Sequence, residues 1–153
     1  MFSRTAFVMA ALLCGATFIS VHAGSNTQSA DQQAAQPAAR PGGWTIPPTA
    51  NDEKNPLSGD PKALDTGKEL FGKKCQKCHG PGGKGDGPDA DPDHQEDMDL
   101  TVARRATRNP DGVVFYKIWN GRTKPKMPAL GKELSKEQVW AIVTYVQTLR
   151  QKS

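Results

Sequence analysis

Cysteine is scarce in this chain of 153 residues, which has three: Cys14, Cys75 and Cys78. Cys14 lies in an apolar N-terminal stretch, where we interpret it as an apolar filler rather than a lipidation site. The other two are so close in sequence that a disulfide between them would close only a tiny loop. No disulfide framework is therefore available to hold a small exported fold together.

Apolar side chains and charge of one sign are also in short supply. Hydrophobic residues make up 36% of the chain and aromatic residues 7%, which is thin for a globular core. The formal net charge is +4, from 20 basic and 16 acidic residues, too weak and too mixed to indicate nucleic-acid binding. The glycines of residues 80–87 precede no Lys-Ser or Lys-Thr pair, which excludes a phosphate-cradling loop.

The chain has one long apolar run, at its N-terminus. Arg4 precedes an apolar stretch from Thr5 to Val21, and Val21-His22-Ala23 has the small-residue pattern of a cleavage site. This arrangement predicts a signal peptide over residues 1–23 and export to the periplasm. The alternative is an uncleaved membrane anchor, for which the apolar run is slightly short.

A Cys-x-x-Cys-His motif at residues 75–79 is the attachment signature of a c-type haem. Cysteines three apart lie one helical turn apart, so both sulfurs can reach the vinyl groups on one edge of a porphyrin. His79 follows directly and is the expected proximal ligand of the iron. A redox-active cysteine pair would need a thioredoxin-like alternation of strands and helices, which is absent from the sequence. A structural zinc site would need a fourth ligand, and after the leader the only other His or Cys is His94.

The motif predicts one covalent haem c, and export agrees with it because bacterial haem attachment is completed outside the cytoplasmic membrane. A buried porphyrin would supply the apolar volume that the composition lacks. We therefore expect the chain without haem to fold poorly.

Residues 24–59 are expected to form a linker rich in Pro, Gly, Ala and Gln, because such a segment buries little apolar surface. Trp44, Ile46 and Leu57 complicate its second half. They either pack on the folded domain as an extended strap or contact a partner, and packing is the favoured interpretation.

The folded domain is predicted over residues 60–153. Asp60 and Pro61 have the residue types of an N-cap and a first helical position. The helix that they begin is expected to carry one stripe along one face, formed by Leu64, Gly67, Phe71, Cys75 and Cys78.

Two more helices are predicted further along the chain. Asn109-Pro110 repeats the cap-then-proline signal before a short amphipathic helix that ends at Gly121. Ser135 and Gln138 form a capping box for a last helix that should run to about residue 150.

Residues 80–99 are predicted to be a loop, because its first half is rich in glycine and its second half is acidic. Asp89, Asp91 and Asp93 alternate as calcium ligands do. An EF-hand count, however, places His94 where Gly is needed and Leu100 where Glu is needed. A solvated acidic loop is the expected structure.

The segment that follows Gly121 holds Met127 between Pro125 and Pro128. Because Met127 is a lone apolar residue in a stiff, basic loop, we expect its side chain to point inward. The basic residues around it and around the haem motif predict a rim that steers an acidic redox partner to the haem edge, although a merely solvated surface accounts for them equally well. These residues are Lys73, Lys74, Lys77, Lys84, Arg122, Lys124 and Lys126.

With these pieces in place, residues 60–150 resemble the class I c-type cytochromes. The resemblance rests on the haem motif, on Gly67 and Phe71 before it, and on three later features: Gly87-Pro88, Met127-Pro128 and the aromatic pair Trp140 and Tyr145. It implies an all-α fold of three to five helices around one haem. It also implies that Gly67 allows the first and last helices to cross closely, with Phe71 near Ile142 and Tyr145.

The resemblance further implies roles at the iron. Met127 would be the distal ligand, and the carbonyl of Pro88 would accept a hydrogen bond from His79. Met98 and His94 are rival distal ligands in an acidic segment, residues 86–99, that matches no motif of the family.

The expected function is that of a mono-haem electron carrier, not an enzyme, whose partners are redox proteins such as a dehydrogenase, an oxidase or another cytochrome. Two alternatives stay open: a haem-bearing subunit of a dehydrogenase or oxidase complex, and an open-site haem sensor or peroxidase-like protein. A monomer without nucleic-acid partners is expected.

Overall fold

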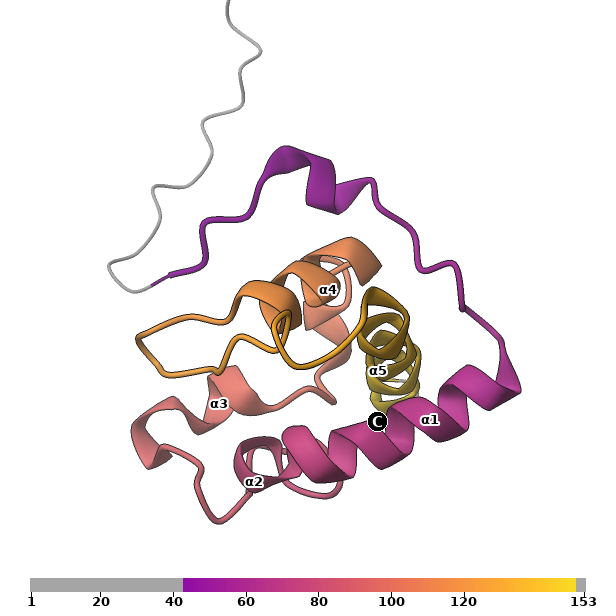
Figure 1. Ribbon diagram of the computed structural model, residues 1–153. Helices are drawn as coiled ribbons and strands as arrows, with labels where there is room; N and C mark the ends of the chain where they lie inside the picture. The colour runs from indigo at the N-terminus through magenta and orange to yellow at the C-terminus, as the bar shows by residue number, and fades with distance from the viewer. Residues whose placement is uncertain (1–42, 151–153) are drawn as a thin grey trace, which may run out of the picture. The chain divides into compact units, whose positions relative to one another are not determined.

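The computed structural model describes residues 43–150 of the chain. It contains five α-helices and three short 3₁₀ turns (Figure 1). The helices are α1 (Pro61–Lys74), α2 (Gln76–His79), α3 (Gln95–Met98), α4 (Asp111–Asn120) and α5 (Lys136–Leu149), and the turns are η1 (Pro48–Asn51), η2 (Pro92–His94) and η3 (Ala103–Arg105). Among the described residues there are two isolated β-bridges and no longer strand, which confirms the predicted all-α fold.

Helix α1 begins as its sequence predicts. The Asp60 side chain accepts hydrogen bonds from the backbone N–H groups of Lys62 (2.8 Å) and Ala63 (3.3 Å), and Pro61 is the first helical residue. The helix ends at Lys74, and Cys75 lies between α1 and the single turn of α2. The cysteines of the motif are therefore placed by two consecutive helices rather than by one.

Helices α1 and α5 form the main contact of the fold (Figure 1). Gly67 makes this contact possible, because a Cβ atom there would lie 1.9 Å from the carbonyl oxygen of Ala141. One turn later the ring of Phe71 packs against that of Tyr145, with centroids 5.2 Å apart. Phe71 and Ile142 are both fully buried, which confirms the expected crossing.

Helix α5 is closed at its N-terminus by the predicted capping box. The Ser135 hydroxyl accepts from the Gln138 N–H at 3.2 Å, and the Gln138 side chain accepts from the Ser135 N–H at 2.9 Å. The helix ends at Leu149, one residue before the predicted end. It supplies much of the core, which also includes side chains of α4 and the loop between them.

Two predictions about local structure were wrong. Helix α4 is not capped by Asn109, whose side chain instead donates to the Arg105 carbonyl at 2.9 Å, so Pro110 takes the N-cap position. The segment 80–99 is a loop only in its glycine-rich part. Beyond the glycines Asp91 caps a turn that starts at Pro92, and this turn leads into α3.

The segment before α1 packs onto the helices, as the strap interpretation of Trp44 and Leu57 predicts. We call residues 43–59 the N-terminal strap. Within the strap, the side chain of Ala50 is buried. The side-chain amide of Asn55 donates to the Trp140 carbonyl (3.2 Å) and to the Thr144 hydroxyl (2.8 Å). The signal peptide and the first part of the linker lie outside the described residues, so those predictions, and the boundary at residue 60, stay predictions.

Candidate functional site

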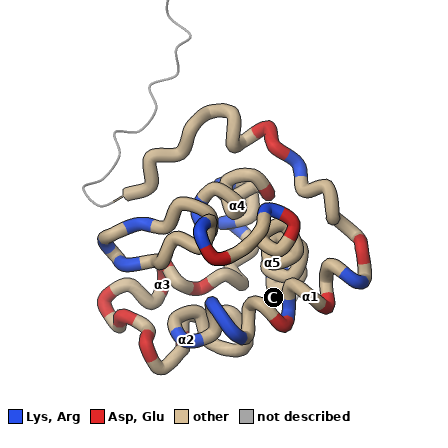
Figure 2. The backbone as a smooth tube through the Cα atoms, viewed as in Figure 1, with Lys and Arg blue, Asp and Glu red and all other residues tan. Residues whose placement is uncertain are grey.

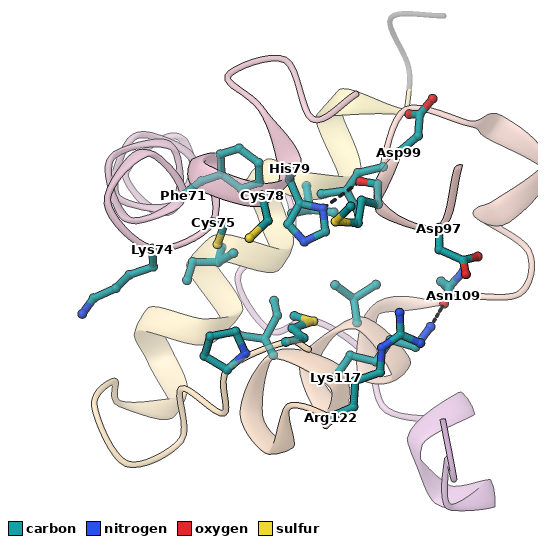
Figure 3. Close-up of a pocket in the computed structure, with 18 of the residues that line it drawn as sticks. Phe71, Lys74, Cys75, Cys78, His79, Asp97, Asp99, Asn109, Lys117 and Arg122 are labelled. Atoms are coloured by element: carbon teal, nitrogen blue, oxygen red, sulfur yellow. Dashed lines mark hydrogen bonds between the residues drawn. The ribbon is translucent and has the colours of Figure 1, made fainter. Parts of the chain in front are cut away.

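The residues of the Cys-x-x-Cys-His motif line a cavity of about 500 Å³. Pockets of roughly 300–1,000 Å³ hold cofactor-sized ligands. In Figure 3 the sulfur atoms of Cys75 and Cys78 and the imidazole of His79 point toward the same space. Much of the remaining wall is apolar and is built by Phe71, Leu100, Val114, Ile118, Leu130, Ile142 and Val146.

Both cysteines are free thiols. Burial, with a smaller contribution from Cys78, raises the pKa of the Cys75 thiol to about 12. Cys75 is therefore protonated at neutral pH. A thiol that stays protonated in a largely apolar cavity suits attachment to an apolar ligand better than metal binding, which requires a thiolate.

The ring of His79 is fixed by one hydrogen bond. Its Nδ1 donates to the carbonyl oxygen of Met98 at 2.7 Å. A carbonyl only accepts, so the ring proton must lie on Nδ1, and the lone pair of Nε2 is free to bind a metal. Burial lowers the pKa of His79 and the nearby positive charge of Arg122 adds to this, against the opposing effect of the Met98 carbonyl, so the imidazole is held in its neutral, metal-binding form.

The expected hydrogen bond from His79 to the carbonyl of Pro88 is not the one in the structure. Residues 87–89 fold back onto the end of α2, where Gly87 N–H donates to the Cys78 carbonyl (3.3 Å) and Asp89 N–H to that of Lys77 (2.8 Å). Pro88 does not line the cavity. Residues 98–100 line the cavity in place of Pro88. They are held at this position by the Leu100 N–H, which donates to the Gly83 carbonyl at 2.6 Å.

The three candidate distal ligands are placed differently. Met127 lines the cavity and packs against the core, and its backbone exchanges two hydrogen bonds with Arg122, at 2.8 and 2.9 Å. Met98 also lines the cavity, but its carbonyl is bound to His79. His94 does not line it, and its ring lies 3.1 Å from the carboxylate of Asp91.

One end of the cavity is basic, which the sequence interpretation missed. It is lined by cations that come from four separate parts of the chain: Arg105, Lys117, Arg122 and Arg150. Lys117 and Arg122 lie across the cavity from the motif (Figure 3). A signal was present for Lys117, because a lysine within the otherwise apolar and aromatic run of residues 113–119 must reach a polar or anionic partner.

The basic end carries more cations than anions: Asp97 also lines the cavity, and its carboxylate lies 3.7 Å from the guanidinium of Arg105. The Nε atoms of Arg105 and Arg122 are buried and have no hydrogen-bond partner among residues 43–150. Burial and the positive charges of Arg122, Arg150 and Arg105 lower the pKa of Lys117 to about 8. Porphyrins of the haem type carry two carboxylates on one edge and are otherwise apolar, so thiols and imidazole at one side, apolar walls and a basic end fit this group.

Charged residues of opposite sign lie on different segments of the chain (Figure 2). Lys and Arg occur in the loop that holds Met127 and where α1 is followed by α2, whereas Asp and Glu gather along the segment that leads into α3. Among the described residues no group of three or more His, Cys, Asp or Glu side chains is arranged to hold a metal ion.

Comparison with known proteins gives two matches. The family described as cytochrome C oxidase, cbb3-type, subunit III matches residues 62–146. The "Cbb3-type cytochrome c oxidase subunit FixP" of Azorhizobium caulinodans is 34% identical over 91 residues, which are 60% of this chain and 29% of that protein. The chain thus matches less than a third of the length of this relative. The N-terminal strap lies before the residues that match the family.

Proposed function

Since the chain belongs to the cbb3-type cytochrome c oxidase subunit III family, whose members are electron-carrying cytochrome c domains, we propose that it carries one haem c and exchanges single electrons with a respiratory oxidase. The observation that carries this proposal is the arrangement of His79. Its Nδ1 is bound to a carbonyl and its ring lies beside two free thiols in an apolar cavity.

In this proposal the sulfurs of Cys75 and Cys78 would hold the haem through two thioether bonds, and Nε2 of His79 would bind its iron. Met127 is the distal ligand, and its support is its position in the cavity on a loop fixed by the backbone pairing with Arg122. Met98 replaces Pro88 as the residue that orients His79, through its backbone carbonyl.

The haem supplies a one-electron couple, and the protein sets its conditions. Ligation by His and Met raises the reduction potential and keeps outside ligands from the iron. The apolar walls exclude water, and the basic end meets the haem carboxylates with Arg105, Lys117 and Arg122. No residue transforms a substrate in this proposal, so none is called catalytic.

We place the domain in the periplasm, on the support of the predicted leader. Among residues 43–150 no helix has the length and apolar character needed to span a membrane. The similarity to an oxidase subunit favours an oxidase-associated role over a freely diffusing carrier. Purification of the full chain under mild conditions separates the two: an oxidase that stays bound supports association, and a monomeric haem protein alone supports the carrier.

The ligands are tested by the absorption spectrum of the purified, oxidised protein in the far red, where a Met–Fe(III) bond gives a weak band. Met127→Ala should abolish this band while covalent haem is retained. Met98→Ala is the matched control, because it removes the other cavity methionine and leaves the carbonyl that binds His79. A band that survives in Met127→Ala, or is absent from the unmodified holoprotein, would overturn the distal assignment and favour an open-site haem protein.

A further inference from the structure

Trp44 of the N-terminal strap closes the basic end of the cavity. Its half-buried side chain is one of the residues that line the cavity. The Nζ atom of Lys117 lies 5.4 Å from the centroid of the indole ring, and Cζ of Arg122 lies 4.9 Å from it. Both cations are thus within the roughly 6 Å at which an aromatic face attracts a positive charge.

The strap that carries Trp44 is attached to the domain at two further points. The Gly112 N–H at the start of α4 donates to the Glu53 carbonyl at 3.2 Å, and a Cβ atom on Gly112 would lie 2.3 Å from the Ala50 carbonyl oxygen. Asn55 holds the strap to α5 through Thr144. The position of Trp44 is therefore fixed by the same helices that form the cavity.

The two cations covered by Trp44 are held from other sides as well. Lys117 donates to the side-chain oxygen of Asn109, and the backbone of Arg122 is paired with that of Met127. The Nε atom of Arg122 has no hydrogen-bond partner within the described part of the chain. The indole therefore contacts Lys117 and Arg122 on one side. On the other side both cations line the cavity, where they can bind an anionic group of a ligand.

We propose that Trp44 is a positioning residue for the haem: it holds Lys117 and Arg122 against the haem carboxylates and shields that edge from water. This inference rests on the proposed function, because the carboxylates are those of the haem. It assigns to the strap, which lies outside the family match, a part of the cofactor site.

The consequence is a higher reduction potential. Two positive charges held close to the haem and shielded from water disfavour the ferric state, which carries one more positive charge than the ferrous state. Without the indole, water screens the cations and hydrates the carboxylates. Both changes favour the ferric state and lower the potential.

The test is the midpoint potential of the full-length holoprotein in Trp44→Ala, Trp44→Phe and Ile46→Ala. Ile46 is the matched control, because it is a half-buried residue of the same strap that does not line the cavity. We expect Trp44→Ala to raise the ratio of oxidised to reduced protein about three- to tenfold at a fixed potential, because water then screens the field of the two cations at the iron. Trp44→Phe, which keeps an aromatic face, should recover most of this change, and Ile46→Ala should leave the ratio unchanged.

Three results would overturn the inference: an unchanged potential in Trp44→Ala, an equal change in Ile46→Ala, or no recovery in Trp44→Phe. If Trp44→Ala yields no holoprotein, Trp44→Leu takes its place, because it keeps apolar bulk but lacks an aromatic face; it is expected to raise the ratio in the same way, and an unchanged ratio would overturn the inference. The far-red band is recorded for every variant. Its absence from the unmodified protein refutes the proposed ligation, whereas its presence together with an unaltered potential refutes the role of Trp44 alone.

Discussion

The close approach of α1 to α5 at Gly67 can be tested with one methyl group. Replacing Gly67 by Ala would place a Cβ atom 1.9 Å from the carbonyl oxygen of Ala141 and 2.6 Å from its carbonyl carbon. Ordinary C···O contacts begin at about 3.3 Å, so α1 and α5 would have to separate by roughly 1.4 Å at this point.

Such a separation should be costly because the obstacle is the backbone of α5. Overpacking that side chains can absorb costs about 1–3 kcal/mol, and a helix backbone yields less than a side chain does. The shift would also loosen the buried contact of Phe71 with Tyr145. We expect Gly67→Ala to lower the free energy of unfolding by about 3 kcal/mol or more, a large part of the roughly 5–15 kcal/mol of a typical domain.

The same helix contains its own control. Gly72 is exposed, and a Cβ atom there would meet only the side-chain oxygen of Gln76, at 3.6 Å. Alanine is favoured over glycine in a helix by about 0.8–1.0 kcal/mol, so Gly72→Ala should stabilise the protein slightly. The two substitutions are chemically identical and are expected to have opposite signs.

Urea unfolding of the holoprotein, followed by far-ultraviolet circular dichroism, measures both changes. A free energy of unfolding for Gly67→Ala within about 1 kcal/mol of the unmodified protein would refute the close crossing of α1 and α5, since overpacking of this kind costs more. A loss in Gly72→Ala as large as that in Gly67→Ala would show that the effect is one of helix propensity, not of packing.

Three further predictions concern single side chains. Asn55→Ala should lower the free energy of unfolding by about 2–3 kcal/mol, since it removes bonds of 2.8–3.2 Å that join the strap to α5. Ser135→Ala should cost about 1 kcal/mol, because it breaks the capping box of α5. The midpoint potential should fall as the pH rises through 8 or somewhat above, because loss of the Lys117 proton removes a positive charge beside the haem. Burial lowers the pKa of Lys117 to about 8, and haem carboxylates bound beside it would raise this pKa again. Lys117→Gln should remove this step in a potentiometric pH titration.

Each of these has a clear contrary result. Asn55→Ala as stable as the unmodified protein in urea would mean that the strap is not anchored at α5. Ser135→Ala without any loss would mean that water replaces the capping hydroxyl at no cost. A step in the potential that persists in Lys117→Gln would assign the titration to another group.

The sequence predicts the helices whose signals are local. The Asp60 cap and the Ser135 capping box each lie within one helical turn, and both are confirmed. Gly67 at the crossing could be foreseen only through the resemblance, because nothing in its immediate neighbours shows what it faces. The start of α4 was misjudged because Asn109 makes a better bond backwards, to the carbonyl of Arg105, than it could as a cap.

The site shows the same division between local and distant information. The cysteines and His79 are consecutive, so their joint presence in one cavity follows from the motif. The carbonyl that orients His79 was assigned to the wrong residue, because it depends on how a twenty-residue loop closes, which Gly83 and Leu100 decide through one hydrogen bond. The basic end was missed because its residues approach one another only in the folded chain.

The pairing of α1 with α5 also sets an order of events during folding. The two helices are joined by the intervening residues 75–135, and the strap anchor at Asn55 bonds to a residue 89 positions later. Contacts over such separations form slowly, because the loop entropy is lost before they are made. The wall that α5 provides is therefore expected to form late, and until then the thiols of Cys75 and Cys78 stay accessible to the haem of the proposed function.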